Sequence, residues 1–274
     1  MFVRDDAPEA AARFAEAGHP IGDAPLYEVT PRVAARLSTL ETPAAVMAVF
    51  PLPEAPALGE LRSPAGAGAG QSSRQPLAPV IVYADRLADP GNLGTLVRAA
   101  AAFAAAALVA SPGSVDLFSP KVVRASMGAV FALPLAQDAE IGGLVDELRP
   151  AAVFGLVAHG GRPLDDALSA PATSRGAGAA GAGRQEPDDR AAAGGPGPFV
   201  LCVGAERAGL SAETQAAVTD PVTIPLAAAA GPAIESLNAG VAGAIALYEF
   251  SRRPARAARK EGGARPSGPA PQKE

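Results

Sequence analysis

Short apolar runs alternate with longer helical patterns between residues 79 and 252. Buried strands are predicted where such a run is bounded by turn residues, at 79–84, 107–110, 131–135, 151–158 and 199–204. Helices are predicted between the strands, at 94–107, 120–130, 141–148 and 211–218. Strands that alternate with helices predict an α/β fold, in which a parallel sheet is covered by helices on both faces. Ligands of such sheets usually bind at the carboxyl ends of the strands.

The last part of this pattern predicts a strand, a loop and a buried helix. Residues 222–224 are expected to form a short strand, and a helix is expected over 236–250 with Ser236 as its N-cap. Because this helix carries almost no charge, we expect it to be buried on nearly all sides. Gly240 and Gly243 weaken a helix interior, so they predict the close approach of another backbone, from this chain or from a partner subunit.

The chain outside this pattern divides into a small unit and three segments of biased composition. Residues 1–53 are predicted to form a small mixed domain, with helices at 7–17 and 30–37 and a strand at 45–50. The second domain is predicted over 78–253. Stretches rich in Pro, Gly and Ala are predicted to be a flexible linker, a disordered insertion and a disordered tail, at 54–77, 171–198 and 254–274.

Composition narrows the classes of protein. The single cysteine, Cys202, excludes an internal disulfide framework, and with only two histidines it makes a structural zinc site improbable. A reducing, cytoplasmic setting is expected. No secretion signal or membrane span is expected, because no run of about 18 apolar residues lacks glycine or proline. The net charge of −5 argues mildly against a surface for nonspecific nucleic-acid binding.

Polar groups gather in three loops, each just after a predicted strand. The first loop, DPGNLG, contains Asn92 and is followed on the next helix by Arg98. The second loop, GAERAGL, contains Glu206 between glycines that let a ligand approach the backbone. The third loop ends in SLN at 236–238. Taken alone, Arg98 is as consistent with an ordinary surface residue as with a functional one. The order of the three loops and their common place at strand ends favour one binding site.

At these residues the chain resembles the SpoU (TrmH-like) family of RNA ribose 2′-O-methyltransferases, members of the SPOUT class. The resemblance rests on DPGNLGTLVRAAAAF, FVLCVGAERAGLS and IPLAAAAGPAIESLNAGVAGAIALYE, which occur in the family's order within residues 79–252. It implies a trefoil-knotted sheet, an exception to the rule against knotted chains. It also implies a homodimer with the cofactor site near its interface. Residues 1–53 resemble the latter part of an L30e-like RNA substrate-binding domain, apparently truncated before Met1.

The resemblance also implies roles for particular residues. S-adenosylmethionine is expected to be held by the backbone of the three loops and by apolar side chains, at Val203, Gly204, Ala205, Gly209, Ile224, Leu226, Ser236, Leu237 and Asn238. The expected catalytic residues are Arg98, Asn92, Glu206, Ser236 and Asn238. Arginine is a poor proton acceptor because its pKa is above about 12. Arg98 is therefore expected to bind a substrate phosphate or to polarise the 2′-hydroxyl, without being assigned as the base. No metal is expected.

The expected function is S-adenosylmethionine-dependent methylation of a ribose 2′-hydroxyl in structured RNA. Ribosomal RNA is favoured over transfer RNA by the attached small domain. One alternative is a knotted RNA-binding protein without catalysis, against which the intact Asn92, Arg98, Glu206 and Asn238 count. Another is a tRNA 2′-O-methyltransferase. A dehydrogenase-like enzyme should carry a glycine fingerprint after its first strand, and GNLGTL does not provide it.

Overall fold

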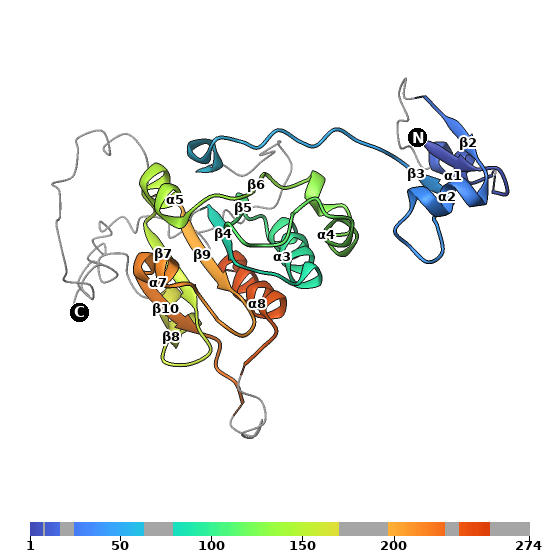
Figure 1. The fold of residues 1–274 in the computed structure, drawn as a ribbon. Coiled ribbons are helices and arrows are strands. Elements are labelled where there is room, and N and C mark those ends of the chain that lie inside the picture. The colour runs from blue at the N-terminus through green and yellow to red at the C-terminus, as the bar shows by residue number, and fades with distance from the viewer. Residues whose placement is uncertain (8, 17–24, 63–78, 170–196, 228–235, 253–274) are drawn as a thin grey trace, which may run out of the picture. The chain divides into compact units, whose positions relative to one another are not determined.

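The computed structural model describes residues 1–7, 9–16, 25–62, 79–169, 197–227 and 236–252 (Figure 1). By its contacts the chain divides into two compact units, Met1–Glu54 and Ala55–Glu274. The predicted tail, residues 63–77 of the predicted linker and all but the last two residues of the predicted insertion lie outside the described residues.

The first unit is a three-stranded sheet with two helices. Its elements in chain order are β1 (Phe2–Arg4), α1 (Glu9–Glu16), β2 (Tyr27–Val29), α2 (Pro31–Leu37) and β3 (Val46–Met47). β1 is the central strand, parallel to β2 and antiparallel to β3. Both predicted helices are confirmed, and the predicted strand at 45–50 is shortened to β3. β1 and β2 are absent from the sequence prediction, because three residues carry too little alternation to be recognised.

The second unit is built on a seven-stranded sheet in which every neighbouring pair is parallel, in the order β6-β5-β4-β9-β7-β10-β8. The strands are β4 (Val80–Asp85), β5 (Ala107–Ala110), β6 (Leu135–Ala136), β7 (Ala152–Leu156), β8 (Arg162–Pro163), β9 (Phe199–Gly204) and β10 (Asp220–Thr223). The helices are α3 (Pro90–Ala102), α4 (Pro120–Ala125), α5 (Ile141–Leu148), α6 (Leu164–Ser169), α7 (Ala212–Ala217) and α8 (Ala239–Arg252), with 3-10 turns η1 (Leu58–Arg62) and η2 (Ala129–Phe131). The predicted parallel α/β sheet is confirmed.

Helices cover both faces of this sheet. α3, α4 and α8 pack on one face, and α5 and α7 lie on the other (Figure 1). The side chains of β4 alternate between two cores, because successive residues of a strand point to opposite faces. Val82 belongs to the core under α3 and α8, and Tyr83 belongs to the core under α5. Both faces of β4 are therefore apolar, which explains the unbroken apolar run in the sequence.

Helix α3 begins at Pro90, four residues before the predicted start at Gly94. Its N-cap is Asp89, whose carboxylate accepts a hydrogen bond from the Asn92 amide at 2.7 Å. Proline suits the first helical position because the helix does not use its missing amide hydrogen there. Asn92 therefore lies in the first turn of a helix rather than in a loop.

Helix α8 begins at Ala239, so the prediction of Ser236 as its N-cap is wrong. The cap is Asn238, whose side-chain oxygen accepts a hydrogen bond from the Val241 amide at 3.1 Å. The expectation of burial on nearly all sides is also wrong. Val241, Ile245 and Tyr248 are 45%, 36% and 46% exposed, and their spacing places them on one stripe of the helix.

The close approach predicted from the glycines of α8 is made by α3 of the same chain (Figure 1). A Cβ on Gly240 would lie 3.1 Å from the backbone oxygen of Asn92. A Cβ on Gly243 would collide with the side chain of Leu96. The two helices thus pack closely from the first turn of each.

Two other sequence predictions are corrected. The predicted linker contains η1, where Leu61 is 1% exposed and packs with the core under α5, so residues 58–62 are part of the second unit. The predicted helix over 120–130 is divided, because Gly128 adopts φ +86 between α4 and η2. The strand predicted at 131–135 is displaced, since Phe131 ends η2 and strand β6 covers only Leu135–Ala136. None of the described helices has the length and apolar character needed to cross a membrane.

Candidate functional site

Three side chains from distant parts of the second unit form a hydrogen-bonded chain. Asn238 Nδ2 donates to Asn92 Oδ1 at 2.7 Å, and Asn92 Nδ2 donates to a carboxylate oxygen of Glu206. The partners are 146 and 114 residues apart in the sequence. The Asn92 side chain accepts one hydrogen bond through its oxygen and donates another through its nitrogen. These two bonds connect the first turn of α3 with the start of α8 and with the loop after β9.

Asn238 both caps helix α8 and forms a hydrogen bond within the site. Its side-chain oxygen caps α8, which leaves its side-chain nitrogen to donate to Asn92. The amide therefore has one defined orientation, and that orientation depends on the helix being capped. Ser236 lies two residues earlier and is exposed on the wall of the neighbouring cavity.

The loop after β9 is a closed turn, in which the amides of Ala205 and Gly209 each donate to the other residue's carbonyl, at 3.0 and 2.9 Å. A Cβ on Gly204 would collide with the backbone of Gly209, which itself adopts φ +67. Residues without a side chain are therefore required at both positions. The turn presents Glu206 to Asn92.

A cavity of about 450 Å³ lies at the carboxyl ends of β7, β9 and β10, where ligands of parallel sheets are expected. Eight of the nine residues predicted to bind the cofactor line it, namely Val203, Gly204, Ala205, Gly209, Ile224, Leu226, Ser236 and Leu237. The ninth, Asn238, is outside the wall and is hydrogen bonded to Asn92. The described part of the wall contains one carboxylate, that of Glu206.

One side of the cavity was missed by the sequence interpretation. The end of β7 and the residues after it, 156–159, also line the cavity and include His159. Their place follows from the pairing of β7 with both β9 and β10. The strand itself is visible in the sequence, but no local signal shows which strands will be its neighbours.

Arg98 is not part of the cavity wall. Its side chain is exposed on α3, and among the described residues it makes no hydrogen bond or ion pair. A Cβ on Gly240 would lie 3.2 Å from Thr95, and the rings of Phe103 and Tyr248 are 5.7 Å apart. Contacts with α8 are thus made before and after Arg98 in the sequence, whereas Arg98 itself is exposed and does not line the cavity.

Burial raises the pKa of two side chains on the strands β4 and β9. The pKa of Tyr83 is raised to about 12, by burial first and by the negative charge of Asp85 second. The same two causes, in the same order, raise the pKa of the Cys202 thiol above its usual range. Both groups stay protonated near neutral pH, so neither is a nucleophile or a base there. The described residues contain no group of three or more His, Cys, Asp or Glu placed to hold a metal ion.

Comparison with known proteins finds a match to the SpoU rRNA Methylase family over residues 79–248. A 23S rRNA (uridine(2479)-2′-O)-methyltransferase from Streptomyces viridochromogenes is 31% identical over 179 residues, which are 63% of this chain and 52% of that protein. A 23S rRNA (guanosine(2553)-2′-O)-methyltransferase from Bacillus subtilis is 28% identical over 62% of this chain and 57% of its own. The chain thus spans about half the length of these curated relatives. The crystal structure of an AdoMet-bound rRNA methyltransferase from Sinorhizobium meliloti superposes with a TM-score of 0.58 and 25% identity, over 92% of this chain and 79% of that one.

Proposed function

Because the chain belongs to the SpoU rRNA methylase family, we propose that it transfers a methyl group from S-adenosylmethionine to a ribose 2′-hydroxyl of ribosomal RNA. The observation that carries the proposal is the hydrogen-bonded chain of Asn238, Asn92 and Glu206 at the cavity. It joins one residue from each of the three polar loops. The two 23S rRNA 2′-O-methyltransferases among the relatives support ribosomal RNA as the substrate.

The cavity has the size and chemistry that S-adenosylmethionine needs. Its volume of about 450 Å³ is within the usual range for small-molecule sites. Ile224, Leu226 and Leu237 offer apolar surface for the adenine, and the turn at 204–209 offers backbone groups. The Glu206 carboxylate on the wall can accept hydrogen bonds from ribose hydroxyls. When bound, the cofactor supplies a methyl group on a positively charged sulfur, and the protein has only to position the attacking oxygen.

We assign Arg98 to the RNA rather than to the cofactor. Its guanidinium is exposed, lies outside the cavity wall and has no partner among the described residues. It can therefore donate to an RNA phosphate or to the 2′-hydroxyl.

The exposed stripe of α8, formed by Val241, Ile245 and Tyr248, supports a homodimer. Large apolar side chains at one helical spacing are typical of a surface that a partner covers. Arg98 is exposed on α3, the helix that packs against α8. We propose that pairing two chains through the stripe brings Arg98 near the interface.

From the resemblance we also propose a trefoil knot in the second unit and an RNA-binding role for the first unit. We further propose that the protein acts in the cytoplasm. The buried free thiol of Cys202 is compatible with a reducing compartment.

The test of function is methyl transfer from labelled S-adenosylmethionine to total RNA that lacks the modification, followed by alkaline hydrolysis. A methyl group on the 2′-oxygen blocks cleavage, so we expect the label in alkali-resistant dinucleotides of the ribosomal fraction. Label in mononucleotides would show methylation of a base instead. Label in transfer RNA alone would reassign the substrate, and RNA binding without any label would indicate a protein that has lost catalysis.

Arg98→Ala tests the assignment of Arg98 within this reaction. We expect the Kd for S-adenosylmethionine to stay within about twofold, because Arg98 is outside the cavity, and turnover to fall by about 100-fold or more. Arg98→Lys keeps the charge but loses the planar fork, so it should recover only part of the activity. Equal losses of cofactor binding and turnover in Arg98→Ala would mean that Arg98 belongs to the cofactor site.

A further inference from the structure

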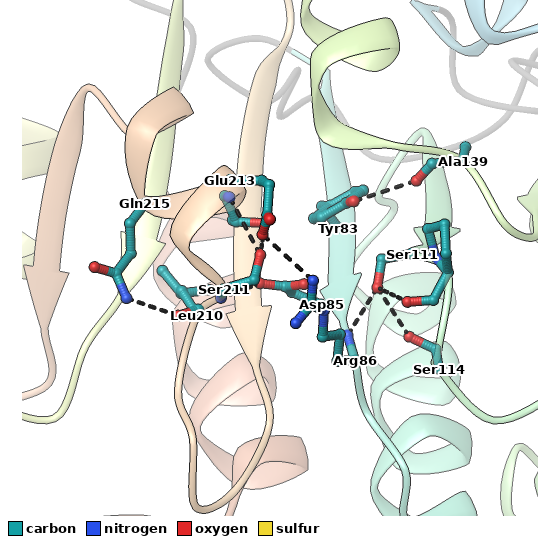
Figure 2. Close-up of polar contacts among 12 residues, drawn as sticks. Tyr83, Asp85, Arg86, Ser111, Ser114, Ala139, Leu210, Ser211, Glu213 and Gln215 are labelled. Carbon is teal, nitrogen blue, oxygen red and sulfur yellow. Dashed lines mark hydrogen bonds and ion pairs between the residues drawn. The ribbon is translucent and has the colours of Figure 1, made fainter.

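A buried carboxylate stands at the base of the turn that carries Glu206. Asp85 is the last residue of β4 and is 1% exposed. Its backbone pairs with Gly204 across the β4 and β9 strands. Its side chain accepts a hydrogen bond from the backbone amide of Ser211 at 2.6 Å (Figure 2). One residue thus touches the chain where the turn begins and again where it ends.

The turn itself has few other connections to the sheet. Residues 206–209 are exposed, and the backbone bonds between Ala205 and Gly209 close the turn on itself without joining it to a strand. The Leu210 side chain is buried in the core under α5, and Gln215 donates to the Leu210 carbonyl at 2.7 Å. The Asp85 carboxylate is therefore a direct polar tie between the end of the turn and strand β4.

We propose that Asp85 is a positioning residue for methyl transfer, which holds the turn at 205–210 so that Glu206 meets Asn92 at the cofactor cavity. The proposal rests on the proposed function and adds to it a residue outside the cavity wall. Glu206 lies on the turn and its hydrogen-bond partner, Asn92, lies on α3, so their contact depends on where the base of the turn is held. Small displacements of positioning groups can lower turnover by about 100-fold.

The charge of Asp85 is part of this arrangement. A hydrogen bond from an amide to a carboxylate is about twice as strong as one between neutral groups. Asp85 is 1% exposed, so this bond lies in a poorly solvated place. An amide side chain at this position would offer a weaker acceptor and would add hydrogens that have no assigned partner.

Asp85→Asn is the first variant, with Glu213→Gln as its matched control. Glu213 follows the turn in the sequence, and it forms an exposed ion pair with Arg86 at 3.3 Å (Figure 2). We expect Asp85→Asn to raise the Kd for S-adenosylmethionine by about tenfold and to lower kcat by about tenfold or more. Glu213→Gln should stay within about twofold in both, because exposed ion pairs contribute little. Wild-type values in Asp85→Asn would overturn the proposal.

A double-mutant cycle separates positioning from general destabilisation. If Asp85 acts through Glu206, adding Asp85→Asn to Glu206→Gln should cost no more than about a further twofold in kcat. Losses that multiply would show that Asp85 acts independently of Glu206 and would contradict the proposal.

A backbone variant covers the case in which Asp85→Asn does not fold. Ser211 has φ −63, which proline adopts, so Ser211→Pro removes the amide donor without a change of φ. Ser211→Ala keeps the amide and loses the two hydrogen bonds of the hydroxyl with Thr214, one of which caps α7. We expect the proline variant to reproduce the tenfold losses and the alanine variant to keep kcat within about twofold. Equal values for the two variants would exclude a role for the bond to Asp85.

Calorimetric titration with S-adenosylmethionine distinguishes a failure of this proposal from a failure of the proposed function. If the wild type binds the cofactor but does not methylate RNA, the assigned reaction is wrong, and the Kd values of the same variants still test Asp85. If the wild type methylates RNA and the Asp85 variants match it, the reaction stands and the positioning role is wrong.

Discussion

Single polar residues in this site have both a structural and a chemical task. Asp89 caps α3 through the amide of Asn92, and Asn238 caps α8 while it donates to Asn92. The side chains that define the site thus also determine where its two helices begin. Changes at these positions should affect stability and activity together.

Asn238→Ala separates the true cap of α8 from the one expected from the sequence. Removing the cap should lower the free energy of unfolding by about 1 kcal/mol, within a usual range of about 0.5–2 kcal/mol. Ser236→Ala should change it by less than about 0.5 kcal/mol, because the Ser236 side chain is exposed and does not cap the helix. Urea unfolding measures both values, and a larger loss in Ser236→Ala would reverse the assignment.

Tyr83 predicts a loss of stability at alkaline pH. Its folded-state pKa of about 12 lies above the ordinary value of 10.0, so the folded protein keeps the proton while the unfolded chain releases it. The resulting stability is complete below about pH 10 and is lost as the pH rises towards 12.

Tyr83→Phe lacks this group and provides the comparison. From about pH 9 to pH 11.5, the free energy of unfolding of the wild type should fall more steeply than that of Tyr83→Phe, by up to about 1.4 kcal/mol per pH unit. Denaturant unfolding at several pH values measures both slopes. Parallel slopes would mean that Tyr83 titrates alike in the folded and unfolded states.

At the scale of elements, the site depends on how closely α3 and α8 pack. Gly240 and Gly243 let the backbone of α8 approach Asn92 and Leu96 on α3. Asn238 can reach Asn92 only because the two helices start side by side. The alanine-rich character of both helices has the same effect, since small side chains allow helices to approach closely.

Gly243→Ala tests this packing against a matched change in another helix. The added methyl group would collide with Leu96, so we expect a loss of about 1–3 kcal/mol in the free energy of unfolding. Gly143→Ala in α5 has nothing within 4 Å of its new Cβ and should gain about 0.5–1 kcal/mol from helix propensity. Thermal and urea unfolding give the two signs, and a gain in both variants would show that α3 yields to the methyl group.

At the scale of the whole molecule, the cavity and the exposed stripe of α8 are separate features that a dimer would connect. Leu237, Ala239 and Ala242 face the cavity, whereas Val241 and Ile245 of the same segment are exposed. One helix therefore presents one side to the cofactor site and another to solvent.

Ile245→Glu tests the homodimer. A charge in the middle of the stripe should convert a dimer into a monomer, because burying it without a partner is unfavourable. Leu37→Glu, at a residue that is 50% exposed in the first unit, is the control and should leave the mass unchanged. Light scattering after gel filtration gives the mass, and a wild type that is already monomeric would remove this part of the proposal.

The sequence by itself determined the class of fold and the identity of the three polar loops, and its resemblance to a known family indicated most of the cavity wall. The first two features are local, since runs of β-branched residues, proline and glycine fix the conformation of the chain near themselves. Only the tertiary structure decided that β7 closes the cavity, that Asn238 rather than Ser236 caps α8, and that Asp85 meets Ser211 across 126 residues. These are contacts between distant segments. Their geometry depends on strand order and helix packing, which the whole core determines and no single stretch encodes.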